Sequence, residues 1–444
     1  MTNALKKPIA FTPREGIRDN FSSQTINPML VRICLLLVCA FPLAGYAQDD
    51  APTRSAPGFG GPDSVENQIA DDARSVPALF KERVLQPWFD WKASLQEETG
   101  FSFGLDYIGL YLGANNSGDI DNASGGIFRF FGSWDLVRRG TPNTGALVWK
   151  AEHRHRYGDI APSGFGLGPL GYVGFIGAPW NDQGTRLTNL YWRQRFNEGR
   201  STVIGGYFDV TDYVDTFVGG SPWTGFVNLA FSTGSASMFL PNDATLGIAA
   251  ASMLTDNLYA IGGVTNAYAD PTDPFSDSFS RFFNDGEHFA TLELGWTGSQ
   301  ERIYQDNTHV TFWYVDDSVQ AGTDRGWGVN FSHVRHINEK WMPFVRGGYA
   351  EDGGSLLQKS ISGGVLYQSE PGGDLLGVGL NWGQPNKTTF GPGLDDQYTF
   401  EAFYRFQLTQ QLAITPSVEY LKNPALNPND DSLWVVGVRA RLAL

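Results

Sequence analysis

Charged residues alternate with apolar ones in two stretches of the sequence, and this spacing could serve the binding of a solute. The six charged residues are Lys150, Glu152, Arg154, Arg156, Arg193 and Arg195. Residues two apart in an extended strand point to the same side, so each stretch would present its charges on one face. Guanidinium groups donate paired, planar hydrogen bonds that suit sugar hydroxyls. The pattern predicts a positively biased binding track, and the alternatives are a merely polar face or structural pairing with Glu152.

Three further residues could complete such a track. Trp180 and Trp223 lie in long stretches predicted as loops, where their rings could form apolar platforms for sugar rings. The two tryptophans could equally be packed inside folded loops. Asp209 ends a predicted strand and begins a series of spaced aspartates. We include all three residues among the candidates for the path of a solute.

The motifs that would indicate an enzyme or a metal site are incomplete. The stretch 166–171 matches G-x-G-x-x-G, but it contains Pro169 and lacks the required strand-then-helix frame. Ser221 lacks the glycine that a nucleophile elbow requires two positions later. His153 and His155 share a face that has no nearby carboxylate, which favours interfacial histidines over a metal site. The sequence therefore predicts no enzyme and no cofactor, and catalysis by dispersed Ser, His and Asp residues is the alternative.

The composition narrows the class of protein that must position these residues. The 444 residues include 53 Gly, 13 Trp, 17 Tyr and 31 Phe, and only 18% are charged. Long stretches rich in Ala, Leu, Glu and Lys are missing, which argues against all-α and doubly wound α/β folds. The formal net charge of −15 argues against nucleic acid as a partner, because phosphates demand the opposite sign.

The N-terminal region has the features of an export signal. An apolar stretch follows Arg32 and ends with small residues at Gly45 and Ala47, which predicts a signal peptide over 1–47 with cleavage after Ala47. Residues 1–28 are unusually polar, so translation could instead start at Met29. The only two cysteines lie within this signal, which leaves no disulfide framework and no thiolate metal site in the mature chain. Removal of 1–47 leaves 27 basic and 45 acidic residues, a formal charge of −18.

The pattern after the signal changes twice. Residues 48–64 are rich in Pro, Gly, Ser and Asp and are predicted to be a flexible leader. Residues 65–99 have apolar side chains at helical spacing, interrupted by Pro77 and Pro87. We interpret 65–99 as a short helical segment, a possible periplasmic cap or plug, with a separate interaction module as the alternative.

From Gly100 to the end, apolar and polar residues alternate with a period of two. The last such segment places Trp434, Val436 and Val438 on one face and Val435, Gly437 and Arg439 on the other. The pattern predicts about sixteen strands, at 100–113, 126–137, 145–157, 184–196, 201–209, 244–253, 257–265, 287–297, 308–316, 325–334, 340–350, 360–368, 374–383, 396–408, 411–421 and 432–444.

Aromatic residues gather near the starts and ends of these strands. They are Trp134, Trp192, Tyr207, Trp296, Trp313, Trp341, Trp382, Tyr398, Tyr404, Tyr420 and Trp434. A soluble sandwich or propeller, the alternative architecture, gives no reason for such positions. Aromatic girdles at both boundaries of a membrane explain them directly. We therefore predict an all-β fold, a closed antiparallel transmembrane β-barrel of about sixteen strands over 100–444.

Two stretches resemble the carbohydrate-selective porin family of the OprB type. They are GGYFDVTDYVDTF at 205–217, followed by FVN at 226–228, and EYLKNPALNPNDDSLWVVGVR at 419–439. The spacing of Trp91, Leu95 and Gly100 at the opening is also similar. One departure is the terminal Leu444, where such barrels usually end on Phe.

The resemblance implies a sixteen-stranded barrel in the outer membrane of a Gram-negative bacterium. Sugars would cross it by facilitated diffusion, through a narrow lumen that folded loops constrict, with no cofactor. Its partners would be the permeating sugars and outer-membrane lipid, either as a monomer or as a trimer. The alternatives are a barrel exporter, a structural outer-membrane protein without sugar selectivity, and an outer-membrane enzyme.

We predict that the mature protein begins at Gln48 and partitions to the outer membrane, because an Arg-led apolar stretch ends in a cleavable Gly-x-Ala sequence. N-terminal sequencing of membrane-extracted protein should then read Gln48-Asp49-Asp50. Retention of residues 29–47, or recovery of the protein in the soluble fraction, would contradict this prediction.

Overall fold

The computed structural model describes residues 58–80, 84–115, 120–276 and 278–444, all within one compact unit. The predicted signal peptide over 1–47, the possible start at Met29 and leader residues 48–57 lie outside the described residues. No helix among the described residues is long and apolar enough to cross a membrane.

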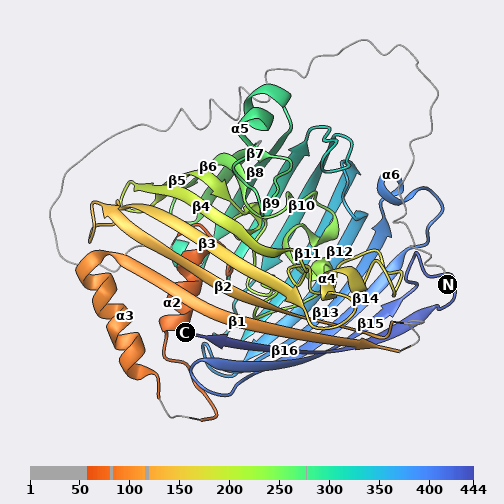
Figure 1. The fold of residues 1–444 in the computed structure, drawn as a ribbon, viewed down its shortest axis with the longest axis horizontal. Helices are drawn as coiled ribbons and strands as arrows, with labels where there is room; N and C mark the ends of the chain where they lie inside the picture. The colour runs from red at the N-terminus through yellow and green to blue at the C-terminus, as the bar shows by residue number, and fades with distance from the viewer. Residues whose placement is uncertain (1–57, 81–83, 116–119, 277) are drawn as a thin grey trace, which may run out of the picture. The chain divides into compact units, whose positions relative to one another are not determined.

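The dominant feature is a closed barrel of sixteen antiparallel strands (Figure 1). Each strand pairs with its neighbours in sequence, and β1 closes the barrel by pairing with β16. The strands are β1 (Phe101–Ala114), β2 (Asn122–Val137), β3 (Gly145–Arg156), β4 (Gly184–Phe196), β5 (Ser201–Phe208), β6 (Thr245–Met253), β7 (Leu258–Asn266), β8 (His288–Thr297), β9 (Asn307–Val315), β10 (Gly326–Val334), β11 (Trp341–Asp352), β12 (Leu357–Gln368), β13 (Leu375–Pro385), β14 (Gln397–Gln407), β15 (Leu412–Lys422) and β16 (Ser432–Ala443). The predicted fold class and the count of sixteen strands are therefore confirmed, and no predicted strand boundary differs from these by more than four residues.

The alternation of side chains explains why these segments form a membrane barrel. On β16, Trp434, Val436 and Val438 are 47–55% exposed, whereas Val435 and Arg439 are 1% and 2% exposed. The apolar set therefore faces outward, where lipid would contact it, and the polar set faces the lumen. Closure gives every strand a hydrogen-bonded neighbour on both sides. This is required because backbone polar groups in lipid have no water to bond with and must pair within the protein.

The aromatic positions mostly agree with outward-facing girdles, with one clear error. Trp134, Trp192 and Trp341 are exposed on the outer surface. The prediction was wrong for Trp313, which is only 3% exposed and points into the barrel. Its Nε1 donates to Asn330 Oδ1 at 3.1 Å. Counting by two from its neighbours on β9 places Trp313 on the lumenal face, so position near a strand end did not decide its direction.

Short and long connections lie at opposite ends of the barrel. The end that holds the start of β1 and the end of β16 has short turns such as 197–200 and 408–411. We assign it to the periplasmic side, where barrels of this kind have their short turns. The opposite end has longer loops, including 157–183 with α4 (Pro162–Phe165) and 209–244 with η1 (Val210–Asp212), η2 (Leu229–Phe231) and η3 (Thr233–Ala236). The remaining short helices lie in connections and are α5 (Ser278–Ser280), η4 (Arg281–Asp285), η5 (Gln300–Arg302) and α6 (Lys387–Phe390).

The N-terminal helical region divides between the inside and the outside of the barrel. Helix α2 (Val65–Ala73) lies within the lumen, and α3 (Gln86–Thr99) packs against the outside of β1 (Figure 1). Residues 58–64, which composition groups with the leader, also pack inside, where Phe59 is buried. We call residues 58–80 the lumenal segment. Lys92 of α3 donates from Nζ to the carbonyl of Leu444 at 2.9 Å, which ties this helix to the end of β16.

A charge on the outward face of β16 should destabilise the barrel. Val438 lies near the middle of this strand and faces outward, so Val438→Arg should cost roughly 2–4 kcal/mol of unfolding free energy near the bilayer midplane. Urea unfolding in lipid vesicles measures this cost, and Val438→Leu is the control for a change of size. Equal losses for both variants would contradict the outward assignment.

The lumenal constriction as the candidate functional site

The loop 209–244 crosses the lumen and is attached to several strands of the barrel wall. We call it the crossing loop. Its Asp212 accepts from Lys150 Nζ on β3 at 2.8 Å. The carbonyl of its Gly225 accepts from Arg439 Nη1 on β16 at 3.0 Å. Two strands of the barrel wall therefore hold this loop, which narrows the lumen from within.

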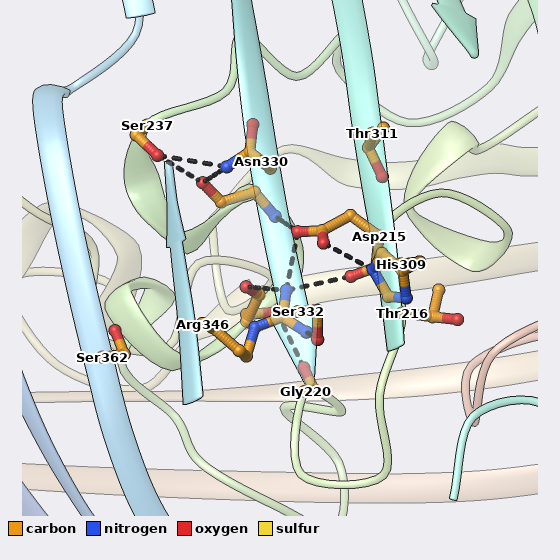
Figure 2. Close-up of polar contacts among 12 residues, drawn as sticks. Asp215, Thr216, Gly220, Ser237, His309, Thr311, Asn330, Ser332, Arg346 and Ser362 are labelled. Carbon is orange, nitrogen blue, oxygen red and sulfur yellow. Dashed lines mark hydrogen bonds and ion pairs between the residues drawn. The ribbon is translucent and has the colours of Figure 1, made fainter. Parts of the chain in front are cut away.

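Asp215 makes the most connected of these attachments (Figure 2). Its Oδ2 accepts from Arg346 Nη2 on β11 at 2.6 Å and from the backbone N of Gly234 at 2.7 Å. Its Oδ1 lies 2.8 Å from His309 Nε2 on β9. The backbone N of Asp215 donates to Glu293 Oε2 on β8 at 2.7 Å. One aspartate thus joins the crossing loop to three strands.

The electrostatics of this attachment favour a charged Asp215. Burial would raise the pKa of its carboxyl, but Arg346 and His309 outweigh burial and lower that pKa. The φ angle of Asp215 is +50°, a left-handed conformation that side chains other than glycine seldom adopt. The hydrogen bonds around the residue hold the backbone in this conformation.

A second attachment joins the crossing loop to β14 and β15. Glu401 accepts from the backbone N of Val227 at 2.9 Å and of Asn228 at 3.0 Å. Asn228 Nδ2 donates in turn to Glu419 Oε2 at 2.8 Å. Phe231 of the loop packs against Gly379 on β13, where an added Cβ would lie 2.7 Å from its ring. The wall therefore has a glycine at this point of close approach, where a larger residue would collide with the loop.

Charged side chains of β3, β4 and the crossing loop gather into one buried group. We call it the paired cluster, and its members are Lys150, Glu152, Arg154, Arg186, Asp212 and Asp243. Arg154 Nε donates to Glu152 Oε2 at 2.7 Å, and Arg154 Nη2 donates to Asp243 Oδ1 at 3.1 Å. Arg186 pairs with the same Asp243. Three cations meet three carboxylates, so the expected positive bias is balanced within the cluster.

Burial and neighbouring charges shift the loop carboxyls of this cluster in different directions. Burial raises the pKa of Asp212 to about 6, although Lys150 beside it acts in the opposite sense. Burial would also raise the pKa of Asp243, but Arg154 and Arg186 outweigh it and lower that pKa. Asp243 therefore stays charged between its two guanidinium partners.

Asp209, one of the predicted path residues, lies next to the cluster and begins η1. Its Oδ1 accepts from the backbone N of Thr211 at 2.9 Å. Burial, together with the carboxylates of Asp212 and Asp243, raises the pKa of Asp209. The structure thus gives this residue the role of capping a turn beside the paired cluster.

Arg193 and Arg195, which the sequence groups with the charges of β3 in one track, lie beside the start of β3 and away from Lys150, Glu152 and Arg154. Both face the lumen, but Arg193 pairs in register with Ala146, and the backbone N of Arg195 donates to the carbonyl of Thr144 at 2.9 Å. They lie at the periplasmic end because antiparallel pairing sets the end of β4 beside the start of β3. The residue opposite Glu152 is Arg186.

Arg156 also lies apart from the paired cluster. Its side chain is 49% exposed and pairs with Asp182 of the loop 157–183 at 3.0 Å. The strand ends at Arg156, so the alternation that buries Arg154 no longer directs its side chain into the lumen.

The two candidate tryptophans are packed inside folded loops, as the alternative interpretation held. Trp180 is fully buried, and its Nε1 donates to the carbonyl of Ile108 at 3.1 Å. Trp223 packs 5.2 Å from it between ring centroids and lies 4.2 Å from the guanidinium carbon of Arg129. Both rings brace loops against β1 and β2 and leave little surface for a sugar.

The sequence analysis left several inward-facing charges out of the candidate solute path. They are Asp106, Arg129, Arg186, Glu293, His309, Arg346, Glu401, Glu419, Arg439 and Arg441. The sequence did contain a signal for them, because each is a charged or titratable residue at a position whose alternation along the strand directs it to the lumen. Asp106 and Arg129 are partners on neighbouring strands, but other partners, such as Asp215 for Arg346, lie in the crossing loop and could not be read in the same way. No group of three or more His, Cys, Asp or Glu suited to a metal ion occurs in the described parts of the chain.

A closed barrel of sixteen antiparallel strands, with an apolar outer surface and a lumen constricted by an inserted loop, defines a porin of the outer membrane. Residues 164–444 match the model of the family described as "Carbohydrate-selective porin, OprB family". The chain belongs to this family. The expectation of a sugar porin, as opposed to an exporter, a structural barrel or an enzyme, is thereby confirmed.

Two solved structures share the fold. The high-pH structure of Pseudomonas putida OprB matches with a TM-score of 0.64 at 16% identity, covering 83% of this chain and 100% of that chain. The low-pH structure of the same protein matches with a TM-score of 0.50 at 13% identity, covering 82% and 100%. At these identities the similarity establishes the fold alone. A search of curated proteins found no match.

Removal of the Asp215 carboxylate should weaken the barrel far more than removal of an exposed one. Asp215→Ala leaves Arg346 buried without its charged partner, which typically costs about 3–5 kcal/mol. Asp317→Ala is the matched control, because Asp317 and its partner Arg325 are both more than 60% exposed and such pairs contribute about 1 kcal/mol or less. Urea unfolding in lipid vesicles compares the two variants, and similar losses would show that Asp215 is not a principal attachment.

Proposed function

We propose that the paired cluster is the contact site for uncharged sugars as they diffuse through the constriction. The single observation that carries this proposal is its charge balance, with Lys150, Arg154 and Arg186 each joined to a carboxylate. Such a group offers many hydrogen-bond donors and acceptors without net charge. Hydroxyl groups can exchange with these bonds, whereas an ion would have to separate a buried pair.

The cluster retains hydrogen-bonding capacity for a solute. The side chain of Asp243 is 13% exposed, more than the 1% and 6% of its partners Arg186 and Arg154. A hydroxyl could therefore donate to Asp243. Individually weak contacts of this kind suit a channel, since a site that binds tightly releases its cargo slowly.

The competing interpretation is that the cluster only fastens the crossing loop to β3 and β4. Lys150 supports that role, because Asp212 engages it fully and Asn189 Nδ2 also donates to Asp212 Oδ2 at 2.9 Å. The two interpretations differ in what happens when the guanidinium groups are replaced by uncharged donors. A fastening role predicts lost assembly, and a contact role predicts altered permeation in an assembled barrel.

Replacing both Arg154 and Arg186 by Gln should shift the ion preference of the pore toward cations and weaken block by a sugar. The carboxylates of Glu152 and Asp243 then remain without their cations inside a low-dielectric wall, which focuses their charge on the pathway. Reversal potential in a KCl gradient and glucose-dependent conductance in a planar bilayer measure the two effects.

Arg200→Gln is the control, because Arg200 lies in the periplasmic turn 197–200 and pairs with exposed Asp256. Heat-modifiable gel mobility reports assembly of every variant. Unchanged selectivity and unchanged glucose block in an assembled double variant would contradict the contact role. A double variant that fails to assemble would instead support the fastening role.

A further inference from the structure

The lumenal segment occupies the periplasmic half of the lumen and reaches the crossing loop (Figure 1). The backbone N of Gly61 donates to the carbonyl of Asp212 at 2.7 Å. Ser221 Oγ donates to Asp63 Oδ1 at 2.5 Å. Near the periplasmic rim, the backbone N of Val76 donates to Gln410 Oε1 at 3.0 Å. The segment thus extends from the rim of the barrel to its constriction.

The charges of the segment complement those of the surrounding wall. Residues 58–80 contain four carboxylates and one arginine. Glu66 pairs with Arg193 and with Arg195, whose Nη2 lies 2.6 Å from Glu66 Oε2. Asp72 Oδ2 lies 2.8 Å from Arg441 Nη2 on β16. The two arginines that the sequence suggested as part of a sugar track therefore bind the acidic segment instead.

Free space in the lumen lies along the wall of β5 to β8, and the segment borders it. Two small cavities lie there and share Tyr213, Ala249 and Ile261 in their linings. The wall beside them carries small residues, which leaves room between the strands and the crossing loop. Gly58–Gly60 and Glu66 line the cavity on the periplasmic side. A solute that follows this wall meets the lumenal segment before it reaches the periplasm.

Polar contacts, with few apolar ones, hold the segment in place. Among its described apolar side chains, only Phe59 and Val65 are deeply buried. The second half of α2 and the residues after it are largely exposed, including Ala70, Ala73 and Leu79. Elements with few buried apolar contacts lie at the low-stability end of a structure and open locally.

We propose that residues 58–80 are a removable plug, which closes the periplasmic half of the pore when bound and opens it when withdrawn. The plug acts by occupying the lumen and by neutralising Arg193, Arg195 and Arg441. Its withdrawal would remove one carboxylate partner from each of these three cations in an enlarged pore, although Arg193 would keep Asp135 and Arg441 would keep Asp106. This gate differs in effect from the sugar contacts at the paired cluster, because it governs the passage of any small solute, including KCl.

A reversible crosslink tests whether the segment moves. Asp63→Cys with Ser221→Cys replaces two side chains already in contact, and the only native cysteines, Cys34 and Cys39, precede the described chain. Oxidation of the double variant should lower its KCl conductance several-fold in a planar bilayer, and dithiothreitol should restore it. Each single-cysteine variant is a matched control that should not respond to the oxidant. Equal conductance of the oxidised and reduced double variant would overturn the proposal and make the segment a fixed part of the lumen wall.

Two further variants keep the proposal falsifiable if the cysteine pair disturbs assembly. Deletion of residues 58–80 should raise conductance several-fold. Glu66→Gln with Asp72→Asn should also raise it, because the ion pairs of the segment with Arg193, Arg195 and Arg441 are then lost. Glu198→Gln with Glu339→Gln, in the exposed periplasmic turns 197–200 and 335–340, is the charge-matched control. Deletion without any rise in conductance, in protein that shows normal heat-modifiable mobility, would also overturn the proposal.

Discussion

The pairing of β1 with β16 is the constraint on which the rest of the molecule depends. In lipid, a strand edge with unpaired backbone groups costs several kcal/mol for each group, so the sheet must close. The seam also carries a lumenal charge bridge. Asp106 of β1 accepts from Arg129 Nε of β2 at 2.8 Å and from Arg441 Nε of β16 at 2.9 Å. One carboxylate therefore joins three consecutive strands across the closing pair.

Closure separates the side chains into two populations with opposite requirements. Outward side chains meet lipid and are apolar, whereas charges collect on the lumenal face. A charge inside a narrow, loop-filled lumen must find a partner, because burial of an unpaired charge is costly. The crossing loop and the lumenal segment supply many of these partners, such as Asp215 for Arg346 and Glu66 for Arg195. The same ion pairs that fasten the inserted segments thus determine how narrow the pore becomes.

The fold was largely predictable, and the reasons are local. Strict alternation identifies each strand, because one face meets lipid and the other meets the lumen. The predicted ends of β4 agree with the structure at both residues. The largest difference is at β2, which begins four residues before the predicted start, in a Gly- and Ser-containing stretch where alternation is weak. Trp313 shows that an aromatic residue near a strand end does not by itself indicate the membrane interface, since its side chain points into the lumen.

The sequence by itself determined which face each strand residue occupies, and it placed Lys150, Glu152 and Arg154 correctly on the lumenal side. It did not determine how far along the barrel axis each residue lies. Depth follows from register, and a bulge between Lys150 and Ala151 shifts the pairing of β3 with β4. The sequence also did not show which charged residues form ion pairs, since Arg346 and Asp215 are 131 positions apart and Glu66 and Arg195 are 129 apart. Only the tertiary structure decided these pairs, because a period of two fixes the direction of a side chain but not the path of a loop that folds back into the lumen.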